Sequence, residues 1–317
     1  MTADRVVIAG ASGFIGRALA RELMADGVEI VALTRDPEAN RHRLPNGVLF
    51  VAWDGRTAGE WVRYVDGALA VVNLTGDSLA KGRWTKAKKR RILDSRTAPG
   101  AALVEAIRRA QAKPHVFVQG SAIGFYGSPG EREVDETARA GEGVLAEVVR
   151  RWEGSTRDVE SLGVRRVVVR SGLVLGRGGG VWPSLVRPFR FFVGGPLGSG
   201  RQWFSWIHLE DEVRAIRFLI GREDLSGVFN LTAPRPLRQR ELCRKIGTAM
   251  RRPCWVPVPA MVLRVLFGEK AGQTLLVSQR AVPRRLGAGG FEFRYPDASA
   301  AIASLVRPGS RGGSAGD

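Results

Sequence analysis

A glycine-rich turn directly after the first apolar segment constrains the fold more than any other feature. Residues 6–9 read Val-Val-Ile-Ala, residues 10–16 read Gly-Ala-Ser-Gly-Phe-Ile-Gly, and apolar residues at helical spacing continue to residue 25. Glycines between a strand and a helix allow a tight turn and a close backbone approach. The helix N-terminus then offers free N–H groups and a positive dipole end to a pyrophosphate. The segment therefore predicts a strand, a dinucleotide-binding turn and a helix.

Apolar, β-branched runs alternate with helical stretches over the rest of the first half. The predicted strands are residues 6–9, 30–33, 49–52, 69–73, 116–120 and 166–170, and the predicted helices are 14–25, 85–95, 98–112 and 145–162. Strands that alternate with helices form βαβ units, in which the strands are parallel. We therefore expect an α/β protein with a Rossmann-type doubly wound parallel sheet and a smaller C-terminal substrate lobe.

The sequence changes in character after residue 171, where glycines and prolines become frequent. We expect residues 1–232 to form an NAD(P)-binding Rossmann domain, with a returning strand at 229–231 and with loops at 171–200 that contribute to the substrate lobe. Residues 233–306 are expected to form that lobe, with helices at 238–250 and 260–276. Residues 307–317 are rich in glycine and serine, which is typical of a disordered tail.

The charge of the chain is strongly positive, with 49 Lys and Arg against 31 Asp and Glu and a formal net charge of +18. Such a balance attracts nucleic acid, anionic lipid or anionic substrates. The arginines are spread along the chain, however, which also fits a solvated basic surface without a partner. The charge therefore leaves an anionic partner open, and the substrate and the oligomeric state are open as well.

Cysteine usage and hydropathy indicate a cytoplasmic protein. Cys243 and Cys254 are the only cysteines, too few for a disulfide framework or a metal-ligand set. No apolar stretch reaches the roughly 20 residues that a transmembrane helix needs. We therefore expect no membrane span and no bound metal.

The end of the second predicted strand favours NADP(H) over NAD(H). Rossmann proteins that bind NAD usually carry Asp or Glu here, which accepts hydrogen bonds from the ribose 2′-hydroxyl. This chain has Thr34 and Arg35 instead, and a guanidinium pairs well with a 2′-phosphate. Asp36 follows directly and works against that preference. Arg96, after the fourth strand, is either a second phosphate contact or a surface arginine.

The chain resembles the extended and atypical branches of the short-chain dehydrogenase/reductase superfamily. More closely, it resembles an epimerase-like family (NAD-dependent epimerase/dehydratase-like) that carries a C-terminal domain of unknown function. Residues 194–200, Gly-Gly-Pro-Leu-Gly-Ser-Gly, followed by Trp206-Ile207-His208, are the most specific part of a likeness that runs from residue 6 to residue 296. The resemblance implies cofactor contacts at Gly10, Ser12, Gly13, Phe14, Ile15, Gly16, Thr34, Arg35, Leu74, Thr75, Gly76, Arg96 and Val174.

The catalytic pair of the superfamily, Tyr-x-x-x-Lys, is missing. None of Tyr64, Tyr126 and Tyr295 has Lys four residues later, and residues 144–149, where the pair is expected, include Val, Leu and Ala but no Tyr or Lys. In the superfamily the Lys lowers the pKa of the Tyr, so that the Tyr can exchange a proton near neutral pH. The usual Ser/Thr position is Ala122 here, with Ser121 one residue earlier.

Three functions remain open, of which we favour the first. The chain is an NADP(H)-dependent, epimerase-like oxidoreductase with another proton-transfer group, a non-catalytic NADP(H)-binding sensor or scaffold, or a basic nucleic-acid-binding module on a Rossmann platform. For an enzyme, Tyr126 and Ser121 are the candidate catalytic residues. Arg201 and Gln202, in the glycine-rich loop, are candidates for holding an anionic substrate.

Overall fold

The computed structural model describes residues 4–79 and 82–306, which form an α/β fold built on one central sheet. Seven parallel strands lie in the order β12-β7-β5-β4-β1-β2-β3. Their bounds are β1 Arg5–Ala9, β2 Glu29–Thr34, β3 Leu49–Ala52, β4 Ala70–Asn73, β5 Val116–Ala122, β7 Arg165–Ser171 and β12 Gly227–Leu231. The predicted fold class is confirmed, and all seven predicted strands occur with ends shifted by at most two residues. The predicted tail, 307–317, lies outside the described residues.

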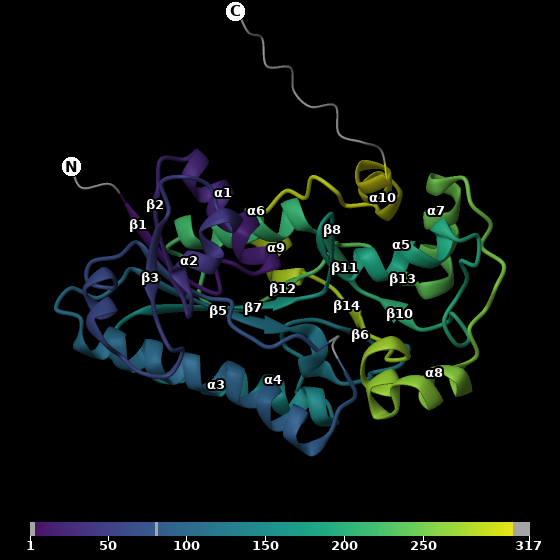
Figure 1. Ribbon diagram of the computed structural model, residues 1–317, viewed down its shortest axis with the longest axis horizontal. Coiled ribbons are helices and arrows are strands. Elements are labelled where there is room, and N and C mark those ends of the chain that lie inside the picture. Colours follow the sequence, from purple (N-terminus) through teal and green to yellow (C-terminus); the bar gives the residue numbers. More distant parts are fainter. Residues whose placement is uncertain (1–3, 80–81, 307–317) are drawn as a thin grey trace, which may run out of the picture.

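Helices cover both faces of the sheet (Figure 1). Helices α1 (Phe14–Ala25) and α6 (Leu209–Gly221) pack together on one face, around core residues such as Leu19 and Ile216. Helices α3 (Lys86–Arg109) and α4 (Val144–Gly154) cover the other face, where Leu103 and Ile107 of α3 are fully buried. The short helix α2 (Pro37–Asn40) follows β2. The sheet is therefore enclosed on both sides, as the long β-branched strands require.

One helix was predicted wrongly as two. The sequence predicted one helix at 85–95 and another at 98–112, with Pro99 near the start of the second, where proline is tolerated. Instead α3 runs through Pro99 without interruption. Pro99 and Gly100 are both buried, and a Cβ at Gly100 would collide with Ser155 and Thr156, which follow α4. Close packing of α3 against the end of α4 thus overrides the local preference for a break.

The predicted helix 145–162 was also too long. Helix α4 ends at Gly154, and the chain continues as a separate 3-10 helix, Arg157–Leu162. Thr156 between them is fully buried, and its hydroxyl accepts hydrogen bonds from the guanidinium of Arg166 on β7. The bend therefore brings a side chain of this segment onto the sheet.

Residues 171–200, predicted as loops, contain regular structure. They form β8 (Leu173–Gly176), β9 (Gly179–Gly180) and α5 (Trp182–Arg190), and β11 (Trp206–His208) pairs with β8. Trp182, Phe189 and Trp206 are buried in a core that they share with α7 (Gln239–Met250) and α10 (Ala298–Val306). The sequence did not reveal α5 because the helix is short, has proline in its first turn and lies between glycine-rich segments.

The remaining elements complete the C-terminal part. Strand pairs β10 (Trp203–Phe204) with β13 (Leu237–Arg238), and β6 (Glu133–Val134) with β14 (Arg280–Ala281), join distant segments. The predicted helix 260–276 ends early: α8 spans Ala260–Phe267, stops at Gly268 with φ of +60°, and is followed by one π-helical turn, Ala271–Leu275. Helix α9 (Arg284–Ala288) follows β14. In the part of the chain that is described, no helix is long and apolar enough to cross a membrane.

Glu212 on α6 is a carboxyl group enclosed in the core. It is fully buried, the Ser171 hydroxyl donates to its Oε1 at 2.5 Å, and its Oε2 has no hydrogen-bond partner among the described residues. Burial raises the pKa of Glu212 from 4.5 to about 8, and the hydrogen bond from Ser171 opposes that rise only in part. The folded protein therefore holds a proton here that the unfolded chain releases above its ordinary pKa.

We predict that Glu212→Gln removes a pH dependence of stability. Because the folded pKa lies above the unfolded value, stability is complete at acid pH and is lost as the pH rises from 4.5 towards 8, with a slope approaching about 1.4 kcal/mol per pH unit. Urea unfolding between pH 5 and pH 8 measures the slope. Glu210→Gln, on the exposed side of the same helix turn, should leave it unchanged; an equal slope in wild type and Glu212→Gln would contradict the assignment.

Candidate functional site

A cavity of about 1360 Å³ opens at the carboxyl ends of β1, β2, β3 and β4. The strand order reverses between β1 and β4, and ligands of open α/β sheets bind at such a switch point. The turn after β1 contributes Gly10, Ser12 and Gly13, and the loop after β4 contributes residues 74–78. One face of α3, including Lys88, Arg91 and Ser95, forms the opposite wall. The geometry is that of a dinucleotide site.

The glycine turn is tight for steric reasons that exclude other residues. Gly10 has φ of +88°, and a Cβ there would lie 2.8 Å from the backbone of Leu74. A Cβ at Gly16 would overlap the carbonyl oxygen of Gly10, so the first turn of α1 could not pack against β1. Helix α1 has Gly13 as its N-cap and no side-chain cap. Its first N–H groups and positive dipole end are therefore left for an anion.

Arg35 is exposed in the lining of the cavity, and the side chain of the neighbouring Asp36 is engaged in a hydrogen bond. The Asp36 carboxylate accepts a hydrogen bond from the backbone N–H of Ala39 at 2.9 Å and so caps α2. Asn40 donates to the Thr34 hydroxyl at 3.0 Å, which holds the end of β2. Arg43 and Arg56 also line this end of the cavity. Three arginines thus line the cavity, and the acid next to Arg35 serves as a helix cap.

Sequence reasoning missed several lining residues after β3. Trp53, Asp54, Gly55 and Arg56 join the cavity because β3 pairs with β2 in parallel, which places the ends of both strands on one edge. Asp54 accepts hydrogen bonds from the backbone N–H groups of Arg56 and Thr57 and from the Thr57 hydroxyl. The missed signal was a Trp-Asp-Gly segment that directly follows a predicted strand.

Several residues that the resemblance assigned to the cofactor do not line the cavity. Arg96 is buried; its guanidinium donates to the carbonyls of Ile92 (2.9 Å) and Asp77 (3.2 Å) and lies over the Trp152 ring, and burial lowers its pKa to about 10. Its hydrogen bond to Asp77 holds the loop that follows β4. Phe14, Ile15, Gly16 and Val174 are likewise outside the lining, whereas Gly10, Ser12, Gly13, Thr34, Arg35, Leu74, Thr75 and Gly76 are part of it.

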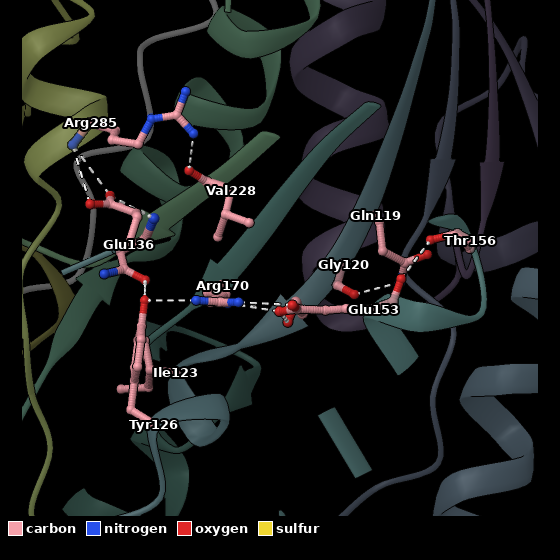
Figure 2. Close-up of polar contacts among 12 residues, drawn as sticks. Gln119, Gly120, Ile123, Tyr126, Glu136, Glu153, Thr156, Arg170, Val228 and Arg285 are labelled. Carbon is pink, nitrogen blue, oxygen red and sulfur yellow. Dashed lines mark hydrogen bonds and ion pairs between the residues drawn. The ribbon is translucent and has the colours of Figure 1, made fainter. Parts of the chain in front are cut away.

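Ser121 and Tyr126, the candidate catalytic residues, are connected by a buried polar network. Figure 2 shows its members Tyr126, Arg170 and Glu153. The Ser121 hydroxyl donates to Glu153 Oε1 at 2.6 Å, and Arg170 donates to both Glu153 oxygens at 2.7 and 2.8 Å. Arg170 also donates to the Tyr126 hydroxyl at 3.0 Å, and this hydroxyl donates to Asn230 Oδ1 at 2.7 Å. Both side chains are thus held inside the fold by the same ion pair.

The network holds both candidates outside the lining of the cavity. Burial raises the pKa of Tyr126, partly offset by Arg170, and its side chain is 3% exposed. Ser121 follows Gly120, where a Cβ would lie 2.8 Å from the Asn73 carbonyl oxygen and 3.3 Å from the Leu74 side chain. The end of β5 therefore adjoins the cavity at Leu74, although neither candidate is part of the lining. Their catalytic roles stay predictions.

Helix α4 presents aliphatic groups where the superfamily places its Tyr and Lys. Gly124 has Val149 and Leu145 as its nearest side-chain neighbours on that helix, at 3.7 and 3.8 Å from an ideal Cβ position. Glu153 is the ionisable residue that α4 directs to the end of β5. The helix therefore contributes a carboxylate in place of a phenol and an ammonium.

The predicted substrate residues lie in the loop before β10. Gln202 is buried, and its amide donates to the carbonyls of Leu197 and Leu275, so it ties the glycine-rich loop to the lobe. Arg201 is exposed next to it, and neither residue lines the large cavity. Among the residues that are described, no group of three or more His, Cys, Asp or Glu side chains is placed to hold a metal ion.

Comparison with known proteins identifies two sequence families along the chain. Residues 6–232 match the model of the NAD dependent epimerase/dehydratase family, and residues 258–305 match a domain of unknown function. An epimerase family protein of Mycobacterium leprae is 38% identical over 96% of both chains. A chloroplastic epimerase family protein of Arabidopsis thaliana is also 38% identical, over 95% of this chain and 86% of its own length.

Solved structures share the fold over nearly the whole chain. A human epimerase family protein crystallised with NADPH superposes with a TM-score of 0.85 at 32% identity, covering 95% of this chain and 99% of its own. A nucleoside-diphosphate sugar epimerase of Corynebacterium glutamicum has a TM-score of 0.74 at 29% identity, covering 96% of this chain and 58% of its own. The two-part arrangement of sheet and C-terminal segment is thus found in other proteins.

We predict that Glu153→Gln destabilises the fold by about 3 kcal/mol, because it leaves the buried Arg170 guanidinium without its counter-charge. The side chains of Arg170 and Glu153 are only 4% and 13% exposed. Urea unfolding measures the loss, and the double variant Glu153→Leu/Arg170→Met should recover much of it. Glu147→Gln, which removes exposed ion pairs of the same helix, should cost less than about 1 kcal/mol. Equal losses in Glu153→Gln and Glu147→Gln would contradict a special role for the buried pair.

Proposed function

The chain belongs to the NAD dependent epimerase/dehydratase family, and we propose that it binds NADP(H) and acts as an epimerase-like oxidoreductase on a small molecule. The observation that carries the proposal is the cavity at the sheet edge, with the glycine turn at one end and Arg35 at the other. Thr34 stands where an NAD-selective acid would be, and Asp36 is engaged as a helix cap. The human relative that was crystallised with NADPH supports the same cofactor.

The proposed cofactor contacts follow the length of the cavity. The turn at Gly10, Ser12 and Gly13 holds the pyrophosphate, and Thr34 with Arg35 holds the 2′-phosphate, aided by Arg43 and Arg56. Leu74, Thr75 and Gly76 lie along the middle of the dinucleotide. In this proposal residues 1–232 form the cofactor domain and residues 233–306 the substrate lobe, with residues 171–200 shared between them.

The proposed chemistry pairs hydride transfer, which NADP(H) supplies when bound, with proton transfer by the chain. Ser121 is the better placed donor and acceptor, because its hydroxyl lies 2.6 Å from a Glu153 oxygen that can take its proton. Tyr126 connects to the same carboxylate through Arg170. Arg201, exposed at the lobe, would attract an anionic substrate.

A second candidate function is a non-catalytic NADP(H) sensor. It is favoured by one observation: Leu145 and Val149 make the proton-transfer face of α4 aliphatic, and Ser121 and Tyr126 are turned into a buried network. A sensor of this kind binds NADPH and shows no turnover. It binds a partner with an affinity that changes when the cofactor is present.

We predict that Arg35→Ala weakens NADPH binding about tenfold or more while NADH binding changes little, because the guanidinium pairs with the 2′-phosphate that NADH lacks. Isothermal titration calorimetry with both cofactors measures the two affinities. Arg157→Ala, a surface arginine outside the cavity, serves as the control and should bind both cofactors as wild type does. Equal loss of NADPH and NADH affinity in Arg35→Ala, or no loss of either, would refute the 2′-phosphate assignment.

We also predict that Ser121→Ala and Tyr126→Phe each lower NADPH turnover by about 10²-fold or more without changing NADPH affinity, since proton transfer is worth about this much. Oxidation of NADPH is followed over a panel of carbonyl compounds and nucleotide sugars. Ser161→Ala and Tyr64→Phe are matched controls outside the network. Wild-type binding without turnover on any substrate would favour the sensor, and full turnover in both variants would exclude these residues as proton donors.

A further inference from the structure

Exposed large hydrophobic side chains are concentrated at one end of the molecule. Among the described residues, every such side chain except Leu49 belongs to two segments, residues 191–193 and 255–267. The most exposed are Phe191 (68%), Trp255 (68%), Met261 (77%) and Val265 (68%). We call the full set the apolar end surface: Phe191, Phe192, Val193, Trp255, Val256, Met261, Val262, Val265, Leu266 and Phe267.

Backbone hydrogen bonds hold the two segments together. Trp255 N–H donates to the carbonyl of Gly194, and its indole N–H donates to the carbonyl of Phe192 at 2.8 Å. Leu197 and Val258 form an isolated parallel bridge, and α8 begins directly afterwards. On α8 the side chains of Met261, Val262, Val265 and Leu266 share one face, while Leu263 is buried opposite them. In Figure 1 α5, α7 and α8 all lie at the end of the molecule away from β1–β3, with α8 apart from the other two.

One member of the surface is held in a strained backbone conformation. Phe192 has φ of +61°, a region that bulky residues rarely occupy. Its ring is 51% exposed, with the guanidinium of Arg252 at 4.3 Å from the ring centroid. The chain thus presents an aromatic ring to solvent at a conformational cost, and such strain clusters at functional sites.

The segments that carry these hydrophobic groups are basic, and the first acid after them, Glu269, is paired with Lys89. Residues 161–209 and 242–268, which include the whole surface, contain no Asp or Glu. Five exposed arginines lie in these segments near the apolar groups: Arg187, Arg190, Arg251, Arg252 and Arg264. A patch of this kind, apolar in the middle and basic around it, is complementary to the anionic interface of a lipid bilayer.

We propose that the apolar end surface binds the interface of an anionic lipid bilayer. Two features select this partner over others. A second copy of the chain would bring the same acid-free, basic segments against one another across a two-fold axis, with net repulsion. Six of the ten members of the surface are aliphatic, among them Met261 and Val265, and such groups insert into lipid but do not stack on bases.

Sedimentation of the full chain with vesicles tests the proposal. We expect binding to phosphatidylcholine vesicles that contain phosphatidylglycerol, much weaker binding to pure phosphatidylcholine, and loss of binding at high salt as screening shortens to about 3 Å at 1 M. The variant Phe191→Ser/Phe192→Asn/Trp255→Ser should bind about tenfold or more weakly. Asn is chosen at 192 because it tolerates the left-handed backbone. Arg251→Gln/Arg252→Gln should lose about fivefold for each arginine.

Matched controls keep the test specific. Leu49→Ser removes an exposed hydrophobic residue at a distant strand, and Arg157→Gln removes an exposed arginine elsewhere; both should bind as wild type does. Thermal unfolding checks that the triple variant is folded. If it is not, Met261→Ser/Val265→Ser on α8 serves as a second variant. Absent binding, equal binding to both vesicle types, or equal binding by variants and wild type would overturn the proposal. The proposal would also be overturned if the same variants abolished a dimer, or a complex with single-stranded DNA, but still bound vesicles.

Discussion

The ion pair between Glu153 and Arg170 is the interaction on which the rest of the site depends. It joins α4 to β7, holds the Ser121 hydroxyl of β5 through one carboxylate oxygen, and orients Tyr126, whose hydroxyl reaches Asn230 on β12. Four elements thus converge on one buried charge pair. Burying such a pair is costly unless its polar atoms are satisfied, and here the hydroxyls of Ser121 and Tyr126 supply further hydrogen bonds to Glu153 and Arg170. The pair therefore ties the carboxyl ends of β5 and β7 to α4.

The same ion pair helps to explain why the fold does not need the Tyr-x-x-x-Lys pair. In a site that uses Tyr and Lys, the helix directs an ammonium to the cofactor and lowers the pKa of the phenol. Here α4 packs Leu145 and Val149 against the turn at Gly124, so the helix gains apolar contacts where it lacks charge. The charge one turn later, on Glu153, is neutralised by Arg170. Packing and the buried ion pair stabilise the helix, and neither of them requires a catalytic Tyr or Lys on it.

The sequence predicted the fold well because periodicity and the glycine turn are local signals. It predicted less where contacts between distant segments decide the outcome. Pro99 lies inside a helix because α3 packs against the end of α4, and Arg96, placed near a phosphate, lies under the loop after β4. Trp53 and Arg56 were missed because their place in the cavity depends on the pairing of β3 with β2. Asp36 appeared to oppose NADP(H) only because its capping bond to Ala39 is not visible in the sequence.

The net charge of +18 takes on meaning once its positions are known. Arg35, Arg43 and Arg56 line the cavity, which suits a cofactor with an additional phosphate. Arg187, Arg190, Arg251 and Arg252 are exposed instead in the segments that carry the apolar end surface, and Arg252 lies over the Phe192 ring. Helix α8 and the residues after it contact the segment that lines the cavity: the carbonyl of Val265 accepts a hydrogen bond from Arg83 at 3.0 Å, and Glu269 pairs with Lys89, the neighbour of the lining residue Lys88. A basic composition that left an anionic partner open in the sequence thus divides into two groups of arginines at different places in the fold.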